Sequence, residues 1–352
     1  MKLQTIVAWS LLSLCLVWNT ACKQTNQPSG ESDSSTDSNA ATPQMQQEPA
    51  SKDEAGDGDT ARTTIAVIPK GTTHVFWNAV KHGAMAAGQE ADVSIFWKGP
   101  VKENARAEQI QVVQQFIAQH VDGIVLAPLD YRALVAPVTA AKEAGIPVVI
   151  IDSALAGEPG TDFVSFIATN NLTGGLLAGE MMTDLLAGEG KVVVMRYIEG
   201  SASTSDRERG YLDAIAASTG IEVLSENQYA GPTAGEAQNS ALNMMSLIRQ
   251  ADGIFCPNES STYGMLLALR QEGLAGQVHF IGFDASPPLV EGLRLGDIDA
   301  LIVQDPQAMG YLGVNAMVSH LAGEKVPAMQ DTGVVLVRRE NMDDPDIQRL
   351  LQ

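Results

Sequence analysis

The residues of this chain that are best suited to chemistry are single polar side chains at the ends of short apolar runs. Each run has the length and the β-branched content of a strand that is buried on both faces. Asp152, Asn258, Asp284 and Gln304 stand at or just after such ends. In an open parallel sheet, the carboxyl ends of the strands form the crevice where ligands bind. One such residue is as consistent with capping the next helix, but their recurrence along one chain favours a binding crevice.

An arginine near a predicted helix start adds a cation to these candidates. Arg207 lies near the start of the helix expected over Thr204–Ser218, although cations favour the opposite end of a helix. In a crevice, its guanidinium offers a rigid fork of donors that matches vicinal hydroxyl groups or a carboxylate. Arg209 is interpreted instead as a member of a surface ion pair.

Aromatic side chains gather at the first strand-to-helix junction. His74, Phe76 and Trp77 follow an apolar strand and a loop of Pro, Gly and Thr. A hydroxyl of that loop, from Thr72 or Thr73, is predicted to cap the helix that begins there. The two rings either pack in the core or face a ligand, and the polar strand ends elsewhere favour a ligand. For His74, packing in the loop and contact with a ligand remain equally open.

Apolar strands alternate with helical stretches from residue 63 onward. Strands are predicted at Thr64–Ile68, Val93–Trp97, Gly123–Leu126, Pro147–Ile151, Val192–Met195, Ile221–Leu224, Gly253–Cys256, Val278–Phe283, Ala300–Val303 and Val334–Val337. Helices are predicted at Val75–Glu90, Glu103–Gln119, Tyr131–Ala144, Leu172–Leu186, Thr204–Ser218, Ala234–Gln250, Thr262–Gln271 and Pro306–Leu321. This alternation predicts parallel sheets with right-handed crossovers, and two doubly wound sheets fit it better than one very wide sheet.

Composition excludes several classes of function. The formal net charge of −20 argues against nucleic-acid binding, which needs a basic face. HExxH, GxSxG, Walker A and CxxC motifs are absent from the sequence, and its histidines lack the spacing of metal ligands. We therefore expect neither an enzyme nor a bound cofactor or metal.

Residues 1–22 have the layout of a secretory signal peptide, with an apolar stretch over Ile6–Trp18. The small residues before Cys22 resemble a bacterial lipobox, which implies that Cys22 is lipidated and anchors the protein to a membrane of the cell envelope. Asn19 departs from the lipobox pattern, and a plain secreted protein cleaved nearby is the alternative.

Residues 23–62 contain almost no large apolar side chain and are predicted to form a disordered tether. Cys256 lies alone in an apolar run and is expected to be a buried small hydrophobe. With Cys15 in the apolar leader and Cys22 lipidated, no disulfide framework is available.

The ordered part of the chain resembles the periplasmic sugar-binding proteins of the ribose-binding type, which share their fold with the ligand-binding part of the lac-repressor family. The likeness covers about Thr63 to Glu340. The motifs that carry it are Thr72-Thr73-His74-Val75-Phe76-Trp77 with Gly83-Ala84, Val148-Val149-Ile150-Ile151-Asp152, Ala168-Thr169-Asn170-Asn171-Leu172-Thr173-Gly174-Gly175, Arg207-Glu208-Arg209-Gly210, Asn258-Glu259, Gly282-Phe283-Asp284 and Gln304-Asp305-Pro306.

This resemblance implies an α/β fold of two doubly wound parallel-sheet lobes joined by a three-strand hinge, the type I periplasmic binding protein fold. The N-terminal lobe would comprise residues 63–168 and 305–331, and the C-terminal lobe residues 169–304 and 332–352. The hinge strands would cross near Thr169, Gln304-Asp305 and Asp331-Thr332.

The resemblance also assigns roles to the candidate residues. Phe76 and Trp77 would stack on the apolar faces of a sugar. Its hydroxyl groups would be hydrogen-bonded by Asp152, Arg207, Asn258, Asp284 and Gln304. Such a site is chemically coherent, because a sugar needs donors and acceptors around its edge and aromatic rings against its C–H faces.

Three positions depart from the pattern that is common among ribose binders. Ala127-Pro128 stands where an asparagine often precedes the proline, Ser153 where an arginine is common, and His74 where an asparagine is common. These departures put ribose itself in doubt as the ligand while leaving the layout of the site intact.

The function implied is that of a monomeric, lipid-anchored extracytoplasmic binding protein. It would capture a sugar, polyol or sugar-like ligand between its lobes and deliver it to an ABC-type permease. The alternative is a sensing protein that presents such a ligand to a membrane receptor or kinase.

Overall fold

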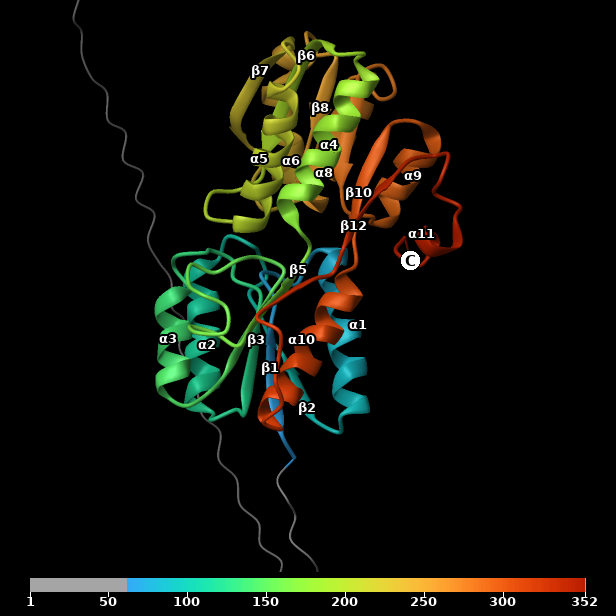
Figure 1. Cartoon of the computed structure of the whole chain (residues 1–352). Helices are drawn as coiled ribbons and strands as arrows, with labels where there is room; N and C mark the ends of the chain where they lie inside the picture. Colours follow the sequence, from blue (N-terminus) through green and yellow to red (C-terminus); the bar gives the residue numbers. More distant parts are fainter. Residues whose placement is uncertain (1–61, 352) are drawn as a thin grey trace, which may run out of the picture. The chain divides into compact units, whose positions relative to one another are not determined.

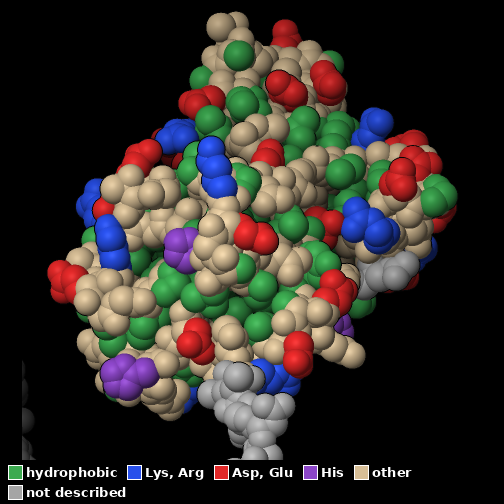
Figure 2. All heavy atoms as spheres, turned by 60° about the horizontal axis from the view of Figure 1, so that its bottom comes forward, with side chains coloured by type: hydrophobic (Ala, Val, Ile, Leu, Met, Phe, Trp, Pro, Cys, Tyr) green, Lys and Arg blue, Asp and Glu red, His purple; other side chains and the backbone are tan. Residues whose placement is uncertain are grey.

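The computed structural model describes residues 62–351 of the 352-residue chain. The predicted signal peptide, Cys22 and the tether up to residue 61 lie outside the described residues. Within residues 62–351, no helix is long and apolar enough to cross a membrane. Acidic, basic and apolar side chains are intermixed on the face drawn in Figure 2.

The first lobe is built on a six-stranded sheet in the order β11-β5-β4-β3-β1-β2, in which all neighbours are parallel. Its strands are β1 (Thr64–Ile68), β2 (Ser94–Trp97), β3 (Gly123–Leu126), β4 (Val148–Ile151), β5 (Ser165–Ala168) and β11 (Met329–Asp331). Its helices are α1 (Val75–Glu90), α2 (Arg106–Ala118), α3 (Val135–Glu143) and α10 (Pro306–Leu321). Figure 1 shows α1 beside α10 on one face of this sheet, with α2 and α3 on the other.

The second lobe is built on another six-stranded sheet, in the order β12-β10-β9-β8-β6-β7. Its strands are β6 (Glu189–Arg196), β7 (Gly220–Tyr229), β8 (Gly253–Phe255), β9 (His279–Phe283), β10 (Ala300–Gln304) and β12 (Val334–Val337), of which β12 alone runs antiparallel to its neighbour. Its helices are α4 (Asn171–Leu185), α5 (Ala202–Ala216), α6 (Ala234–Asn243), α7 (Met245–Ile248), α8 (Glu259–Gln271), α9 (Pro287–Leu295) and α11 (Pro345–Gln348).

Burial explains why the central strands are continuous apolar runs. Every residue of β3, β4 and β8 is buried, because helices cover both faces of each sheet. The apolar side chains form two core clusters in each lobe. Cys256 lies in one of them as a buried free cysteine, as predicted.

The chain passes between the two sheets at three places: from β5 to α4, from β10 to α10, and from β11 to β12. Side chains tie these crossings together. The Thr169 hydroxyl donates to the Gly333 carbonyl over 3.2 Å, and Asp331 accepts from the backbone N–H groups of Gly333 and Asn170. At the middle crossing, Asp305 caps α10 and pairs with Arg349 over 2.8 Å. The predicted fold class, with two parallel-sheet lobes and a three-strand hinge, is confirmed.

Some predicted elements differ from those in the structure. The strands β5 and β11 were not predicted, because each is short and β11 consists of Met, Gln and Asp at a sheet edge. The edge strand β7 runs well beyond the predicted Ile221–Leu224 through polar residues. Helix α9 was also not predicted; it begins with two prolines, a residue that suits the first helical turn. The helix predicted over Ala234–Gln250 is divided at Met244.

Candidate functional site

Loops and helix starts that follow the carboxyl ends of strands in both lobes line a pocket. Its empty volume is about 320 Å³, which includes the part that is open to solvent. Its lining is Lys70, His74, Phe76, Trp77, Glu103, Asp152, Tyr197, Ser203, Thr204, Arg207, Asn258, Glu259, Asp284 and Gln304. All eight residues that the sequence predicted for ligand binding are among these fourteen. The structure therefore brings the predicted set together in one place.

Two aspartates of the pocket have backbone conformations that are rare for residues other than glycine. Asp152 has φ 64° and Asp284 has φ 73°, in the left-handed region that costs such residues roughly 1–2 kcal/mol. Asp152 pairs with Lys70 over 2.8 Å. Asp284 accepts from the Gln304 amide over 2.6 Å and from the Glu259 backbone N–H over 2.7 Å. Strain of this kind is held where the surroundings fix it, often at a binding site.

Gln304 presents an acceptor to the pocket. Because its Nε2 donates to Asp284, its Oε1 faces away from that carboxylate. Gln304 is only 2% exposed, and its Oε1 has no hydrogen-bond partner among the described residues. A buried acceptor without a partner is costly, and a ligand hydroxyl would satisfy it.

Arg207 is held by protein groups on several sides. Its guanidinium lies 3.8 Å from the centre of the Phe283 ring, while Nε donates to Asn171 and Nη1 to the Pro257 carbonyl. Helix α4 approaches α5 closely at this point, since a Cβ on Gly175 would overlap the Arg207 carbonyl. Nη2 is the nitrogen that remains for a ligand. Arg209 forms an exposed ion pair with Asp206, as predicted.

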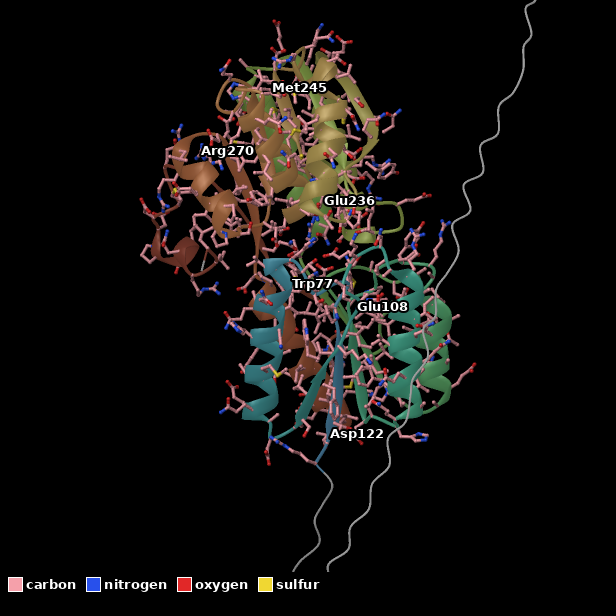
Figure 3. All side chains as sticks on the ribbon, turned by 180° about the vertical axis from the view of Figure 1, so that it is seen from behind. Trp77, Glu108, Asp122, Glu236, Met245 and Arg270 are labelled. Atoms are coloured by element: carbon pink, nitrogen blue, oxygen red, sulfur yellow. The ribbon has the colours of Figure 1, made fainter. Side chains whose placement is uncertain are left out.

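Trp77 belongs both to the core and to the pocket. It is 2% exposed within a core cluster of the first lobe, and its indole N–H donates to Glu103 over 2.7 Å. Phe76 meets it edge-on, with ring centres 4.9 Å apart. Trp77, which is labelled in Figure 3, thus packs in the core, as one alternative held, and also lines the pocket, while its contact with a ligand stays a prediction.

His74 and Glu103 form a buried ion pair of 2.7 Å between Nδ1 and Oε1. Burial by itself would lower the pKa of His74, but the Glu103 carboxylate outweighs it and raises the pKa to about 9. Burial would likewise raise the pKa of Glu103, yet His74, Lys70 and Trp77 lower it to about 2. Both groups are therefore charged at neutral pH.

The predicted cap of α1 was wrong. The N-cap residue is His74, whose side chain makes no capping bond. The first backbone N–H groups of the helix, from Val75 and Phe76, instead donate to the Glu259 carboxylate. Glu259 comes from the second lobe, so no local sequence pattern reveals this cap.

Asn258 lies in the pocket, but its side chain serves its own helix. Its Oδ1 accepts from the backbone N–H and the hydroxyl of Ser261, and its Nδ2 donates to Ser260 over 3.2 Å. The capping alternative considered for strand-end residues is therefore realised here. One amide hydrogen of Nδ2 remains for a ligand.

Sequence reasoning missed six lining residues: Lys70, Glu103, Tyr197, Ser203, Thr204 and Glu259. Lys70 and Tyr197 follow β1 and β6, so the strand-end rule that found Asp152 also applied to them. Glu103 lies in a loop several residues after β2, where no pattern distinguishes it from a solvated glutamate.

The charges of the pocket are nearly balanced. The cations are Lys70, His74 and Arg207, and the anions are Asp152, Glu103, Glu259 and Asp284. Among residues 62–351, no group of His, Cys, Asp and Glu is arranged to hold a metal ion. A pocket of paired charges, hydroxyl groups and two rings suits an uncharged ligand that carries many hydroxyl groups.

Comparison with known proteins is consistent with this chemistry. The family model described as "Periplasmic binding protein domain" matches residues 65–325. The ribose import binding protein RbsB of Salmonella typhimurium is 29% identical over 282 residues, which cover 80% of this chain and 92% of the relative. A xylitol-binding protein of Mycolicibacterium smegmatis is 25% identical over 292 residues, covering 83% of this chain and 81% of the relative.

Solved structures match over a similar range. An ABC transporter solute-binding protein of Agrobacterium vitis with bound D-fucose has a TM-score of 0.78 and 37% identity, covering 82% of this chain and 100% of that one. A carbohydrate transporter solute-binding protein of Agrobacterium radiobacter in complex with D-arabinose has a TM-score of 0.79 and 32% identity, covering 83% and 100%.

Proposed function

The chain belongs to the periplasmic binding protein family, and on this basis we propose that its pocket captures a neutral sugar or polyol and presents it to an ABC-type permease. The observation that carries this proposal is one pocket that combines two aromatic rings with polar groups from both lobes. Related proteins are named for ribose and xylitol, and the two related structures hold D-fucose and D-arabinose. The chain acts as a binding protein rather than an enzyme.

In this proposal the rings of Phe76 and Trp77 face the C–H groups of the sugar. Trp77 is fixed in position by its bond to Glu103, and Phe76 by its edge-on contact with Trp77. Because neither ring has to be ordered when the ligand arrives, little conformational entropy is lost on binding.

The polar groups recognise the hydroxyl groups. Gln304 Oε1 accepts from one hydroxyl, and the carboxylates of Asp152 and Asp284 accept from others. Arg207 donates through Nη2, while its stack on Phe283 keeps the guanidinium plane fixed. His74, whose ring nitrogens are bonded to Glu103 and the Pro232 carbonyl, shapes the pocket beside the rings.

Charge balance selects against charged sugars. A phosphate or carboxylate on the ligand would meet the carboxylates of Asp152, Asp284 and Glu103. Arg207 would be the remaining cation of the pocket lining to offset them, since Lys70 and His74 are already paired. An amino sugar would meet Arg207 in turn. A buried charge that is left without a partner costs roughly 3–5 kcal/mol.

Capture follows from contact with both lobes. A sugar bound between Trp77 of the first lobe and Arg207 of the second stabilises the arrangement in which the lobes meet, by its difference in affinity for the two arrangements. We further propose that the protein is a monomer, held at the cell envelope through lipid on Cys22. Mass spectrometry of the N-terminal peptide from wild type and from Cys22→Ser tests the anchor, and an unmodified wild-type peptide would refute it.

A thermal-shift screen followed by calorimetry tests the proposed ligand class. The panel is D-fucose, D-arabinose, D-ribose and xylitol, with ribose 5-phosphate and glucosamine as charged counterparts. A neutral ligand at one hundred times its Kd should stabilise the fold by about 2.7 kcal/mol. Binding of the charged counterparts alone, or of no neutral member, would contradict the proposal.

A further inference from the structure

The start of α1 makes two hydrogen bonds to the second lobe. The backbone N–H of Val75 donates to Glu259 Oε1 over 3.2 Å, and that of Phe76 donates to Oε2 over 3.0 Å. No side chain of the first lobe caps this helix. A carboxylate of the second lobe therefore performs the capping that a residue adjacent in sequence usually performs.

A second carboxylate makes the reciprocal contact. Glu103 of the first lobe accepts from the Tyr197 hydroxyl of the second lobe over 3.0 Å. The same carboxylate accepts from the indole of Trp77 and pairs with His74. His74 in turn reaches the second lobe, where its Nε2 lies 3.2 Å from the Pro232 carbonyl. Glu103 thus joins the aromatic side of the pocket to the opposite lobe.

We propose that Glu103 and Glu259, hereafter the closure carboxylates, are positioning residues that set the equilibrium between separated and joined lobes. Each carboxylate accepts hydrogen bonds from the opposite lobe, and these bonds exist only when the lobes meet. The inference rests on the proposed capture of a sugar between the lobes, and it adds residues that act on affinity through the protein rather than through the ligand.

These hydrogen bonds are few, but each has an ionised acceptor and is therefore strong. Hydrogen bonds to an ionised acceptor are about twice as strong as bonds between neutral groups, and negative charge is favoured at a helix N-terminus. Glu103 is 5% exposed, so solvent screens it little. Lys102 and Glu236 also pair between the lobes, but over 3.4 Å and with their side chains about half exposed, at 54% and 47%. Such an exposed pair contributes little.

The consequence for binding is a change in the population that is competent to hold the ligand. The apparent Kd equals the intrinsic Kd divided by the fraction of molecules with joined lobes. Removing a closure carboxylate lowers that fraction, so the apparent Kd rises and the ligand leaves faster. Glu259→Gln and Tyr197→Phe leave in place the side chains that are proposed to contact the sugar in either lobe.

The experiment measures lobe separation directly in the full-length protein. Spin labels are attached at two exposed positions, through Gln119→Cys directly after α2 and through Gln250→Cys shortly before β8. They lie at the amino-terminal ends of the strands in their sheets, far from the pocket, so hinge motion changes their distance. Cys256 is buried and stays unlabelled, and Cys15 and Cys22 are replaced by serine in every variant. Pulsed EPR distances are compared for wild type, Glu259→Ala, Glu259→Gln, Tyr197→Phe and a matched control, Glu236→Gln. Figure 3 labels the position of Glu236.

We expect Glu259→Ala to deplete the short-distance population seen in wild type and to raise the sugar Kd about tenfold, mainly through a faster off-rate. Tyr197→Phe, which removes the cross-lobe bond of Glu103 but keeps the carboxylate, should raise the Kd several-fold, and Glu259→Gln should lie between wild type and Glu259→Ala. Glu236→Gln should match wild type. Unfolding temperatures without sugar should stay close to wild type, because each lobe keeps its core.

Two outcomes overturn the inference. One is a distance distribution in Glu259→Ala and Tyr197→Phe that is the same as in wild type. The other is an equal effect of Glu236→Gln, which would assign closure to any charged contact. If no sugar binds wild type, the proposed function fails, but the distance measurement without sugar still decides whether the closure carboxylates act.

Discussion

Each lobe places an aspartate after the corresponding strand of its sheet, yet the two aspartates have different kinds of partner. Asp152 follows β4 and Asp284 follows β9, which hold corresponding places in the two strand orders. Asp152 is paired with the cation Lys70, whereas Asp284 is held by the neutral Gln304 amide and a backbone N–H. The same difference extends to Glu103, which pairs with His74, and Glu259, which accepts backbone N–H groups.

This difference assigns the lobes different electrostatic behaviour. In the first lobe each pocket carboxylate has a cationic partner. In the second lobe, burial raises the pKa values of Asp284 and Glu259. Arg207 and hydrogen bonds oppose this rise at Asp284, and backbone hydrogen bonds and His74 oppose it at Glu259. The pocket side of the first lobe is therefore preformed by ion pairs, while the second lobe offers less fully compensated acceptors to the ligand and to the other lobe.

The largest expected effect comes from breaking the first-lobe ion pair. Lys70→Met leaves Asp152 charged and buried without its partner, so we expect the free energy of unfolding to fall by about 3–5 kcal/mol. Gln304→Leu removes only a neutral partner of Asp284 and should cost about 1–3 kcal/mol. Urea denaturation of both variants measures the difference.

A double variant sharpens this comparison. Lys70→Met with Asp152→Asn removes both charges, and we expect it to recover most of the stability that Lys70→Met loses. Equal losses for Lys70→Met and Gln304→Leu would show that the lobes do not differ in this way.

Next in size is the loss of the second-lobe donor. Arg207→Ala removes the stack on Phe283 and three guanidinium donor groups, and we expect sugar affinity to fall at least a hundredfold, or about 3 kcal/mol. Calorimetry measures this loss, and Arg207→Lys serves as the control that keeps the charge but not the planar fork. Wild-type affinity in Arg207→Ala would remove Arg207 from the site.

A smaller effect is expected from pH, and it should belong to the first lobe. Because the folded pKa of His74 is raised to about 9, its contribution to stability is fully present below about 6.5 and is lost as the pH rises through 9. The lowered pKa of Glu103, about 2, gives a contribution that is present above the ordinary glutamate value and lost as the pH falls toward 2. Denaturation between roughly pH 5 and 10 lies above the acid loss and spans the alkaline loss, so it should show a decline only on the alkaline side.

Glu103→Gln tests the cause of that decline. Without the carboxylate, burial is the main influence left on His74, so its pKa should fall below its ordinary value. NMR titration of the histidine ring measures this pKa, with the exposed His120 as an internal reference. An unchanged pKa of His74 would mean that Glu103 does not hold its proton.

The smallest effects are expected where the surface alone is changed. Arg209→Ala breaks an exposed pair with Asp206 and should change stability by less than about 0.5 kcal/mol. Thr72→Ala and Thr73→Ala should be similarly mild, since neither hydroxyl caps α1. A loss above about 1 kcal/mol in Thr73→Ala would instead favour the threonine cap that the sequence suggested.

The sequence was sufficient where function depends on position along a strand. Asp152, Asp284 and Gln304 follow buried apolar runs, and because the carboxyl ends of parallel strands meet at one edge of a sheet, the sequence alone predicts that they lie together. The same rule was not applied to Lys70, which reads as an ordinary loop lysine between a proline and a glycine.

The sequence was insufficient where function depends on contact between distant segments. Glu259 caps a helix that lies 184 positions away from it in the chain, and Tyr197 reaches Glu103 across 94 positions. Neither contact leaves a periodic or local pattern, because both depend on how the two lobes meet. For Trp77, spacing alone left core packing and ligand contact open, and the structure shows that a side chain buried in the core can also line the pocket.

The contact of Arg349 with Asp305 has a practical meaning for the design of reporters. Asp305 begins α10 at the middle crossing between the lobes, and Arg349 lies near the end of the chain. A fluorescent protein fused after the last residue would therefore be coupled to the hinge through only a few residues. Such a fusion should convert sugar binding into an optical signal, and it is equally a reason to keep affinity tags away from this end when binding constants are measured.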